Sequence, residues 1–169
     1  RRAFSRRCPL LGSAIVDDAT DAELLERWRK SEPGAGEALF KRHFDTVYGF
    51  FETKCAGHAD ELTQSTFLAC VQARDQFRGE SSFRTYLYAV ARKQLYKHYR
   101  DRAPGADFGV TSLQDLGPTP SHLVDKRASD RLLLEALRAI PLELQIALEL
   151  HYWEHMPGPE IARVLDLPE

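Results

Sequence analysis

The stretch HYWEH, residues 151–155, places two histidines four positions apart and a glutamate beside the second. Positions i and i+4 share a face of a helix, so two such imidazoles can bind one zinc ion while the carboxylate activates a zinc-bound water. A zinc hydrolase that uses His151, Glu154 and His155 is therefore one hypothesis. A short motif without its structural context is weak evidence, and histidines are also favourable at the C-terminal end of a helix. We expect no metal or cofactor.

A second segment, residues 77–102, reads FRGESSFRTYLYAVARKQLYKHYRDR and combines basic side chains with aromatic rings. Basic side chains neutralise phosphates, and aromatic rings stack on unpaired bases. Residues 74–102 have a net charge of +5 between two acidic segments, which is typical of a nucleic-acid footprint. The combination predicts a surface for single-stranded or locally opened DNA, with Gly79 allowing a base close to the backbone. A solvated basic helix with core tyrosines is the alternative.

Helices are expected throughout the chain, because apolar residues recur at spacings of three and four and no stretch alternates as a strand would. Residues 103–124 hold three prolines and three glycines without a sustained period, which predicts a linker. We expect a first helix with Asp21 as its N-cap, and further helices at about 37–54, 60–76 and 82–101. After the linker we expect a helix from about 129, one from Pro141 to about 154, and one from Pro159 to 165, with Asp166 following its end.

The same spacing predicts which side chains form the core. In the second helix the inward stripe is expected to be Phe40, Phe44, Val47, Tyr48 and Phe51. In the next two helices the expected inward residues are Leu62, Phe67, Cys70 and Val71, followed by Phe83, Leu87, Val90, Ala91 and Leu95.

Composition excludes several classes of protein. No apolar run approaches the roughly 20 residues of a membrane span, so we expect no membrane insertion. The three cysteines form no C-x-x-C pair, which argues against a disulfide framework and against a cysteine zinc site. A reducing cytoplasm suits such a chain.

Four segments in order resemble bacterial sigma factors of the sigma-70 family, in particular the extracytoplasmic-function (ECF) group. They are ALFKRHFDTVYGFF, DELTQSTFLACVQARDQF, FRGESSFRTYLYAVARKQL and LRAIPLELQIALELHYWEHMPGPEIARVLDLPE. The resemblance implies an all-α fold of two small helical domains joined by a flexible linker. The expected organisation is a tail at 1–17, a sigma region 2 bundle at 18–102, a linker at 103–127, and a region 4 helix-turn-helix at 128–169 that is incomplete at its recognition helix.

The resemblance also implies a function. A sigma factor is not an enzyme; it directs RNA polymerase core to promoters and begins to open the DNA at the minus-ten element. By this resemblance, the residues that dock on the clamp helices of the largest polymerase subunit are expected to be Glu61, Leu62, Gln64 and Phe67. The residues expected to bind DNA at the minus-ten element are Phe77, Arg78, Gly79, Glu80, Ser81, Ser82, Arg84, Tyr86, Tyr88, Arg92, Lys93, Lys97 and Arg100. The residues expected to support the helix-turn-helix are Pro159, Glu160, Ile161, Ala162 and Leu165.

Some residues depart from the pattern that the family often shows. Ser65 and Lys97 stand where acidic residues are common, Tyr86 where tryptophan is, and Lys93 where asparagine is. The sequence stops where the reader of the minus-thirty-five element would begin, so we expect weak recognition of that element. The resemblance further implies an anti-sigma protein that clamps the two domains. A stand-alone helix-turn-helix regulator of duplex DNA and a sigma-like interaction module without promoter activity are the alternatives.

Overall fold

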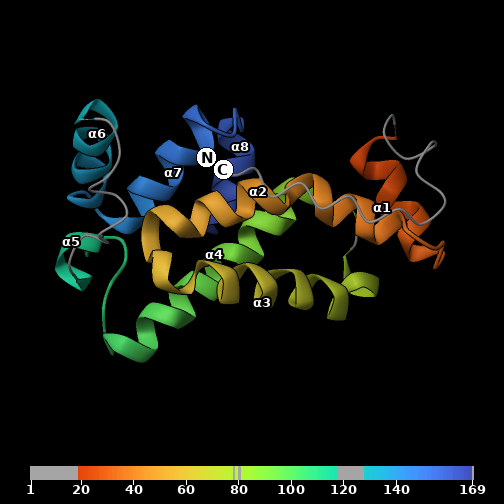
Figure 1. Ribbon diagram of the computed structural model, residues 1–169, viewed down its shortest axis with the longest axis horizontal. Coiled ribbons are helices and arrows are strands. Elements are labelled where there is room, and N and C mark those ends of the chain that lie inside the picture. Colours follow the sequence, from red (N-terminus) through yellow and green to blue (C-terminus); the bar gives the residue numbers. More distant parts are fainter. Residues whose placement is uncertain (1–18, 78, 80, 118–127, 169) are drawn as a thin grey trace, which may run out of the picture.

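The computed structural model describes residues 19–77, 79, 81–117 and 128–168, and within these ranges the regular structure is helical apart from an isolated bridge between Ser112 and Pro141. The all-α prediction is therefore confirmed. None of the described helices is both long and apolar enough to cross a bilayer. The helices in chain order are α1 (Asp21–Arg29), α2 (Ala35–Cys55), α3 (Ala59–Gln72), α4 (Phe83–Arg102), α5 (Leu113–Leu116), α6 (Ala128–Arg138), α7 (Leu142–Tyr152) and α8 (Gly158–Leu165), with 3-10 turns at Ala56–His58 and Arg74–Gln76 (Figure 1).

The N-cap of helix α1 lies one residue earlier than expected. Thr20, and not the expected Asp21, is the N-cap, and it forms a capping box with Glu23. Asp21 is instead used between helices, because its carboxylate pairs with Arg42 at 2.7 Å and with the His43 ring at 2.6 Å, both on α2. This pairing fixes α1 against the first half of α2.

Helices α2, α3 and α4 form the core of the N-terminal half, residues 19–102 (Figure 1). Val47 and Phe51 of α2 are fully buried, as the stripe predicted. Phe44 is 45% exposed, so its assignment to the core is wrong, and Phe50, which the stripe omitted, is buried instead. On α3 the expectation fails in the same way for Val71, which is 47% exposed.

The expected linker is packed against the rest of the chain in its described part, residues 103–117. Phe108 is buried with its ring 4.4 Å from that of Tyr96. Leu113 of α5 is also buried, and Ser112 caps this short helix. The Phe108 carbonyl accepts a 3.2 Å hydrogen bond from the Glu143 amide, which ties the segment to the start of α7. The remainder of the linker, 118–127, lies outside the described residues.

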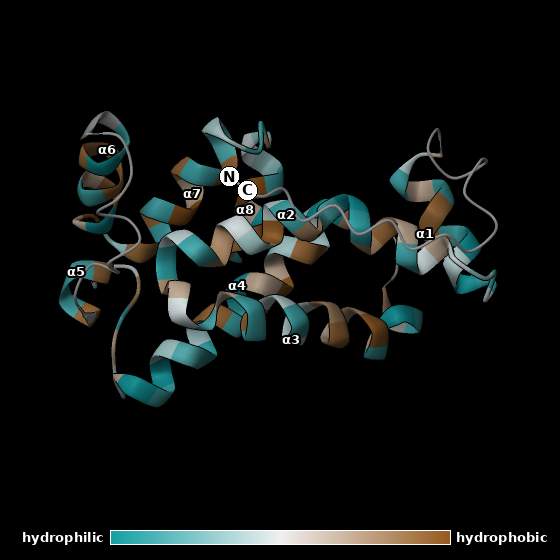
Figure 2. Cartoon of the chain, viewed as in Figure 1, coloured by the Kyte–Doolittle hydropathy of each residue, from teal (hydrophilic) through white to brown (hydrophobic). Residues whose placement is uncertain are grey.

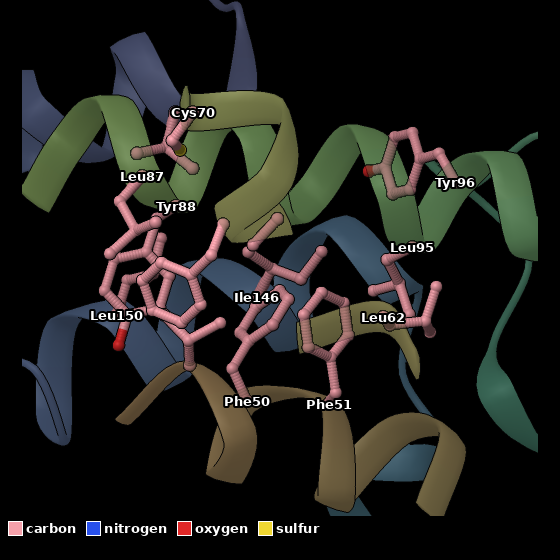
Figure 3. Close-up of a cluster of buried hydrophobic side chains, with 14 of the residues drawn as sticks. Phe50, Phe51, Leu62, Cys70, Leu87, Tyr88, Leu95, Tyr96, Ile146 and Leu150 are labelled. Carbon is pink, nitrogen blue, oxygen red and sulfur yellow. The ribbon is translucent and has the colours of Figure 1, made fainter. Parts of the chain in front are cut away.

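The C-terminal half, residues 128–168, consists of α6, α7 and α8. Pro141 precedes α7, Pro159 lies in the first turn of α8, and Asp166 ends α8 in the left-handed conformation with φ 59°. The expected end of α8 at Leu165 is thus confirmed, whereas the helix begins at Gly158, one residue before the expected Pro159. Apolar side chains from both halves form one core, in which Ile146 and Leu150 of α7 lie close to Phe50 (Figure 3).

Candidate nucleic-acid interface

Helix α4 positions the basic side chains that could meet phosphates. Ser82 caps it, since the Ser82 hydroxyl accepts a 3.1 Å hydrogen bond from the Thr85 amide. Every third or fourth residue then faces the core, and Phe83, Leu87, Ala91 and Leu95 are buried. The opposite side of the helix is consequently left to polar and charged residues.

One exposed line of side chains runs along α4. Lys93, Lys97 and Arg100 are exposed and lie at positions i, i+4 and i+7, so they share one helix face, which we call the basic stripe. Tyr86, half-buried, lies seven residues before Lys93 and therefore continues the same line toward the start of the helix. Arg84 is nine residues before Lys93, which at 100° per residue places it on the other side of α4. The structure thus groups three cations and one ring, and separates Arg84 from them.

Two rings expected on the DNA face are in the core. Tyr88 is 1% exposed and packs edge-on against Phe50 with 5.7 Å between ring centroids, and this burial raises the pKa of Tyr88. Phe77 is 8% exposed and packs against Tyr86 at 4.8 Å. Neither ring can stack on a base in this arrangement, which corrects the expectation for both. Helical spacing could have placed Tyr88, because it lies three residues before Ala91 and seven before Leu95, both of which are buried.

The loop before α4 has one conformationally demanding residue. Gly79 is exposed and has φ 76°, a region that glycine adopts without strain. A side chain at this position would meet no atom within 4 Å, so the backbone conformation alone favours glycine here. Ser81 is half-buried and Ser82 exposed, while Arg78 and Glu80 lie outside the described residues.

Arg92 and Tyr96, which flank the basic stripe, are already bound by the C-terminal half. The Arg92 guanidinium donates to the Glu143 carboxylate at 3.2 Å and to the Val164 carbonyl at 3.2 Å. The Tyr96 hydroxyl donates to the same carboxylate at 3.1 Å. Burial raises the pKa of Tyr96 to about 12, so this hydroxyl keeps its proton. Arg92 therefore has protein partners where a DNA-binding role would give it phosphates.

The residues expected to dock on polymerase divide between the core and the surface of α3. Leu62 and Phe67 are buried, whereas Glu61 and Gln64 are exposed. Leu68 and Val71, which had no predicted docking role, are 54% and 47% exposed. Their positions follow Glu61 and Gln64 at helical spacing, so Glu61, Gln64, Leu68 and Val71 share one face, here called the α3 face. Figure 2 shows that the second half of α3 is mainly hydrophobic.

The residues expected to support a helix-turn-helix all lie on α8. Ile161 and Leu165 are buried, Glu160 and Ala162 are half-buried, and Pro159 is exposed in the first turn. The apolar face of α8 packs on both α7 and α4.

The helical spacing on which the zinc hypothesis rests is absent. Helix α7 ends at Tyr152, so it contains His151 but neither Glu154 nor His155. His155 has φ 51°, outside the helical region, and the two histidines therefore do not share a helix face. Among the described residues no group of three His, Cys, Asp or Glu side chains is arranged to hold a metal ion.

Two regions of the chain match family models in the order that the motifs predict. Residues 39–104 match sigma-70 region 2, and residues 130–169 match sigma-70 region 4. A region 2 match is not expected of a stand-alone helix-turn-helix regulator. The first match covers α4 and the α3 face, and the second covers α7 and α8.

Curated relatives are similar along nearly the whole chain. The ECF RNA polymerase sigma-E factor of Haemophilus influenzae is 26% identical over 168 residues, which cover 91% of this chain and 88% of that protein. Proteins of the same name from Escherichia coli and Salmonella typhimurium are 24% identical over 166 residues, covering 91% of this chain and 87% of theirs. Sigma factors are not enzymes, and they direct RNA polymerase core to promoter DNA. With both sigma regions matched in order and such relatives, the chain belongs to the sigma-70 family, in its ECF group.

Proposed function

We propose that the chain recognises and helps to open the minus-ten element with the basic stripe of α4 and the loop before it. The observation that carries the proposal is the exposure of Lys93, Lys97 and Arg100 along one face. Cations at this spacing follow a phosphate backbone, and Tyr86 at the end of the line offers a ring for an unstacked base. The loop at Gly79 and Ser81 receives the flipped base.

We further propose that the α3 face docks on the clamp helices of the largest polymerase subunit. Leu68 and Val71 supply exposed apolar area, and Glu61 and Gln64 supply a polar edge. Interfaces commonly combine an apolar centre with a polar rim. Leu62 and Phe67 support this face from the core instead of touching the partner.

A cytoplasmic location and control by an anti-sigma protein complete the proposal. Both follow from membership of the ECF group. The second is supported by a set of exposed apolar residues on α6 and α7, which a partner helix could cover. These residues are Leu132, Leu133, Leu144 and Leu148.

Promoter binding by the reconstituted holoenzyme tests the basic stripe. Polymerase core is mixed with the chain and with promoter-like templates whose minus-ten regions are already open, and binding is measured from low to high salt. Replacing Lys93, Lys97 and Arg100 with alanine should weaken binding and reduce the slope of log K against log salt by roughly 0.7–0.9 for each lost phosphate contact. Lys41→Ala, an exposed cation on α2, is the matched control. Full binding by the triple variant with an unchanged slope would refute the proposal.

A further inference from the structure

A cleft of about 430 Å³ lies between α2, α4, α6 and α7, and we call it the interhelical cleft. Sites that hold small molecules in proteins commonly measure roughly 300–1,000 Å³. Apolar side chains from both halves of the chain line this cleft, namely Phe50 of α2, Leu133 and Leu134 of α6, Leu150 of α7, and Trp153, which follows α7. Such a lining can bury the apolar body of a ligand.

The charged part of the lining is acidic. The described residues that line the interhelical cleft include four carboxylates and no lysine, arginine or histidine. Glu149 is paired with Lys54 of α2, whose side chain is fully enclosed. Glu52 and Glu154 are half-buried, and neither forms an ion pair within the part of the chain that the structure describes. Their charges beside apolar walls produce a negative potential, which favours a cation over a neutral or anionic ligand.

One buried polar group at the interhelical cleft lacks a partner. Tyr88 lines the cleft from α4 and is 1% exposed, yet its hydroxyl has no hydrogen-bond partner among the described residues. Buried polar groups are nearly always satisfied, so an orphaned hydroxyl at a cleft indicates a place for a ligand. Burial, and then the charge of the Glu154 carboxylate, raise the pKa of Tyr88. The hydroxyl oxygen is therefore close to an anionic group and can accept a hydrogen bond from a cation that Glu154 attracts.

A glycine in the middle of α2 leaves space on one wall of the interhelical cleft. Thr46, Gly49, Phe50 and Thr53 share a helix face and form this wall. Glycine in a helix interior is less stable than alanine would be. A Cβ atom at Gly49 would meet no atom within 4 Å, so close packing does not require glycine here. A longer side chain at this position would instead occupy the space that a ligand needs.

We propose that the interhelical cleft binds a small organic cation with an apolar body, of the arylalkylamine class. The apolar body lies against Phe50 and Trp153, and the ammonium lies near Glu52, Glu154 and the Tyr88 hydroxyl. An ammonium is also attracted to the face of an indole ring, which Trp153 supplies. Residues of the basic stripe and of the α3 face do not line this cleft. The site therefore adds a small-molecule ligand to a protein whose family acts on polymerase and DNA.

Three probes of similar shape and different charge test the proposal. Phenylbutylamine, phenylbutanol and phenylbutyrate are titrated at neutral pH into the isotopically labelled chain, and the affinities are measured by NMR. The indole signal of Trp153, one of two tryptophans in the chain, reports binding at the interhelical cleft. The amine should bind about tenfold or more tightly than either of the other probes, because only the amine forms charge-assisted hydrogen bonds with the carboxylates. Amine binding no tighter than that of the alcohol would overturn the proposal.

Two conservative variants locate the ammonium. Glu154→Gln removes a charge and Tyr88→Phe removes the orphaned hydroxyl, and each should weaken amine binding by about fivefold to tenfold. Glu154→Gln should change the affinity for phenylbutanol by less than about twofold, since the alcohol carries no charge. Glu135→Gln removes an exposed carboxylate of α6 that does not line the cleft, and it should leave amine binding unchanged. Equal losses in Glu154→Gln and Glu135→Gln would mean general attraction to an acidic surface and would reject the site.

Filling the interhelical cleft should abolish amine binding. Gly49→Leu places a side chain in the open space, and leucine is a better helix former than glycine, so the variant should keep its helix content in circular dichroism. Full amine binding by this folded variant would contradict the proposal. If the variant loses helix, the Tyr88→Phe and Glu154→Gln affinities decide.

The rival occupant of the interhelical cleft is the chain's own segment 1–17, which carries four arginines. Removing this segment should change the affinity for phenylbutylamine by less than about twofold if the cleft serves a separate small molecule. An increase of about tenfold or more would show that the segment competes for the cleft, and the small-molecule proposal would then be wrong.

Discussion

The Thr85 hydroxyl donates a 2.7 Å hydrogen bond to the Glu160 carboxylate and so joins the first turn of α4 to α8. Thr85 is buried, and its replacement by valine keeps the shape but removes the donor. We expect Thr85→Val to lower the free energy of unfolding of the free chain by about 1–2 kcal/mol in urea denaturation. Thr111→Val, at a half-buried site where no hydrogen bond of the hydroxyl is seen among the described residues, should stay within about 0.5 kcal/mol. Equal stability of the two variants would show that this contact does not hold α8 on α4.

Polymerase binding should depend on Leu68, the more exposed of the two apolar residues of the α3 face. Burying one leucine side chain contributes about 1.5–3 kcal/mol, so Leu68→Ser should weaken the complex with polymerase core about tenfold or more. Fluorescence anisotropy of the labelled chain measures the affinity. Val110→Ser changes a side chain that is 72% exposed elsewhere and serves as the control. Affinities that fall equally in both variants would count against docking through the α3 face.

Strand opening should require polymerase. Stacking contributes about 1.4 kcal/mol per base-pair step, so opening some ten pairs costs on the order of 14 kcal/mol. One captured base stacked on Tyr86 returns only about 1–3 kcal/mol. We therefore expect no permanganate-reactive thymines in a duplex promoter with the chain alone, and reactivity after core is added. Reactive thymines without core would disprove this expectation.

The His98 imidazole should remain neutral at the pH values of ordinary buffers. Burial, the Arg102 guanidinium and the His58 ring lower the pKa of His98 to about 4. The unfolded chain takes up this proton near pH 6.5, so between pH 6.5 and 4 the unfolded state binds more protons and stability falls as the pH is lowered. NMR titration of the ring should give a midpoint near 4, and His98→Gln should remove this part of the pH dependence. A midpoint near 6.5 would contradict the burial that the structure shows.

Helix positions were predictable because caps and breakers are local signals. Ser82 caps the start of α4 and Asp166 follows the end of α8, close to the expected positions, and the order of these helices follows from spacing alone. The direction in which each helix faces was less predictable. Phe44 and Val71 fit an apolar stripe, yet they are exposed, because the spacing defines a stripe without fixing which of its edges the neighbouring helices cover.

The contacts between the halves could not be predicted from the sequence. Lys54 and Glu149 are 95 positions apart, and each alone resembles an ordinary surface residue of a helix. The basic stripe was visible only in part, because the sequence indicates that residues 77–102 are basic and aromatic but not that Arg92 is bound by Glu143 and the Val164 carbonyl. The grouping of Lys93, Lys97 and Arg100 apart from Arg84 follows from helical spacing, and the structure adds that all three cations are exposed.

The apolar core that both halves share makes the stability of each half depend on the other. Phe50 of the N-terminal half and Ile146 and Leu150 of the C-terminal half belong to one buried cluster. A substitution that leaves a cavity in this cluster should therefore lower the free energy of unfolding of both halves together, in one cooperative transition. Such a change would act at a distance from both the α3 face and the basic stripe.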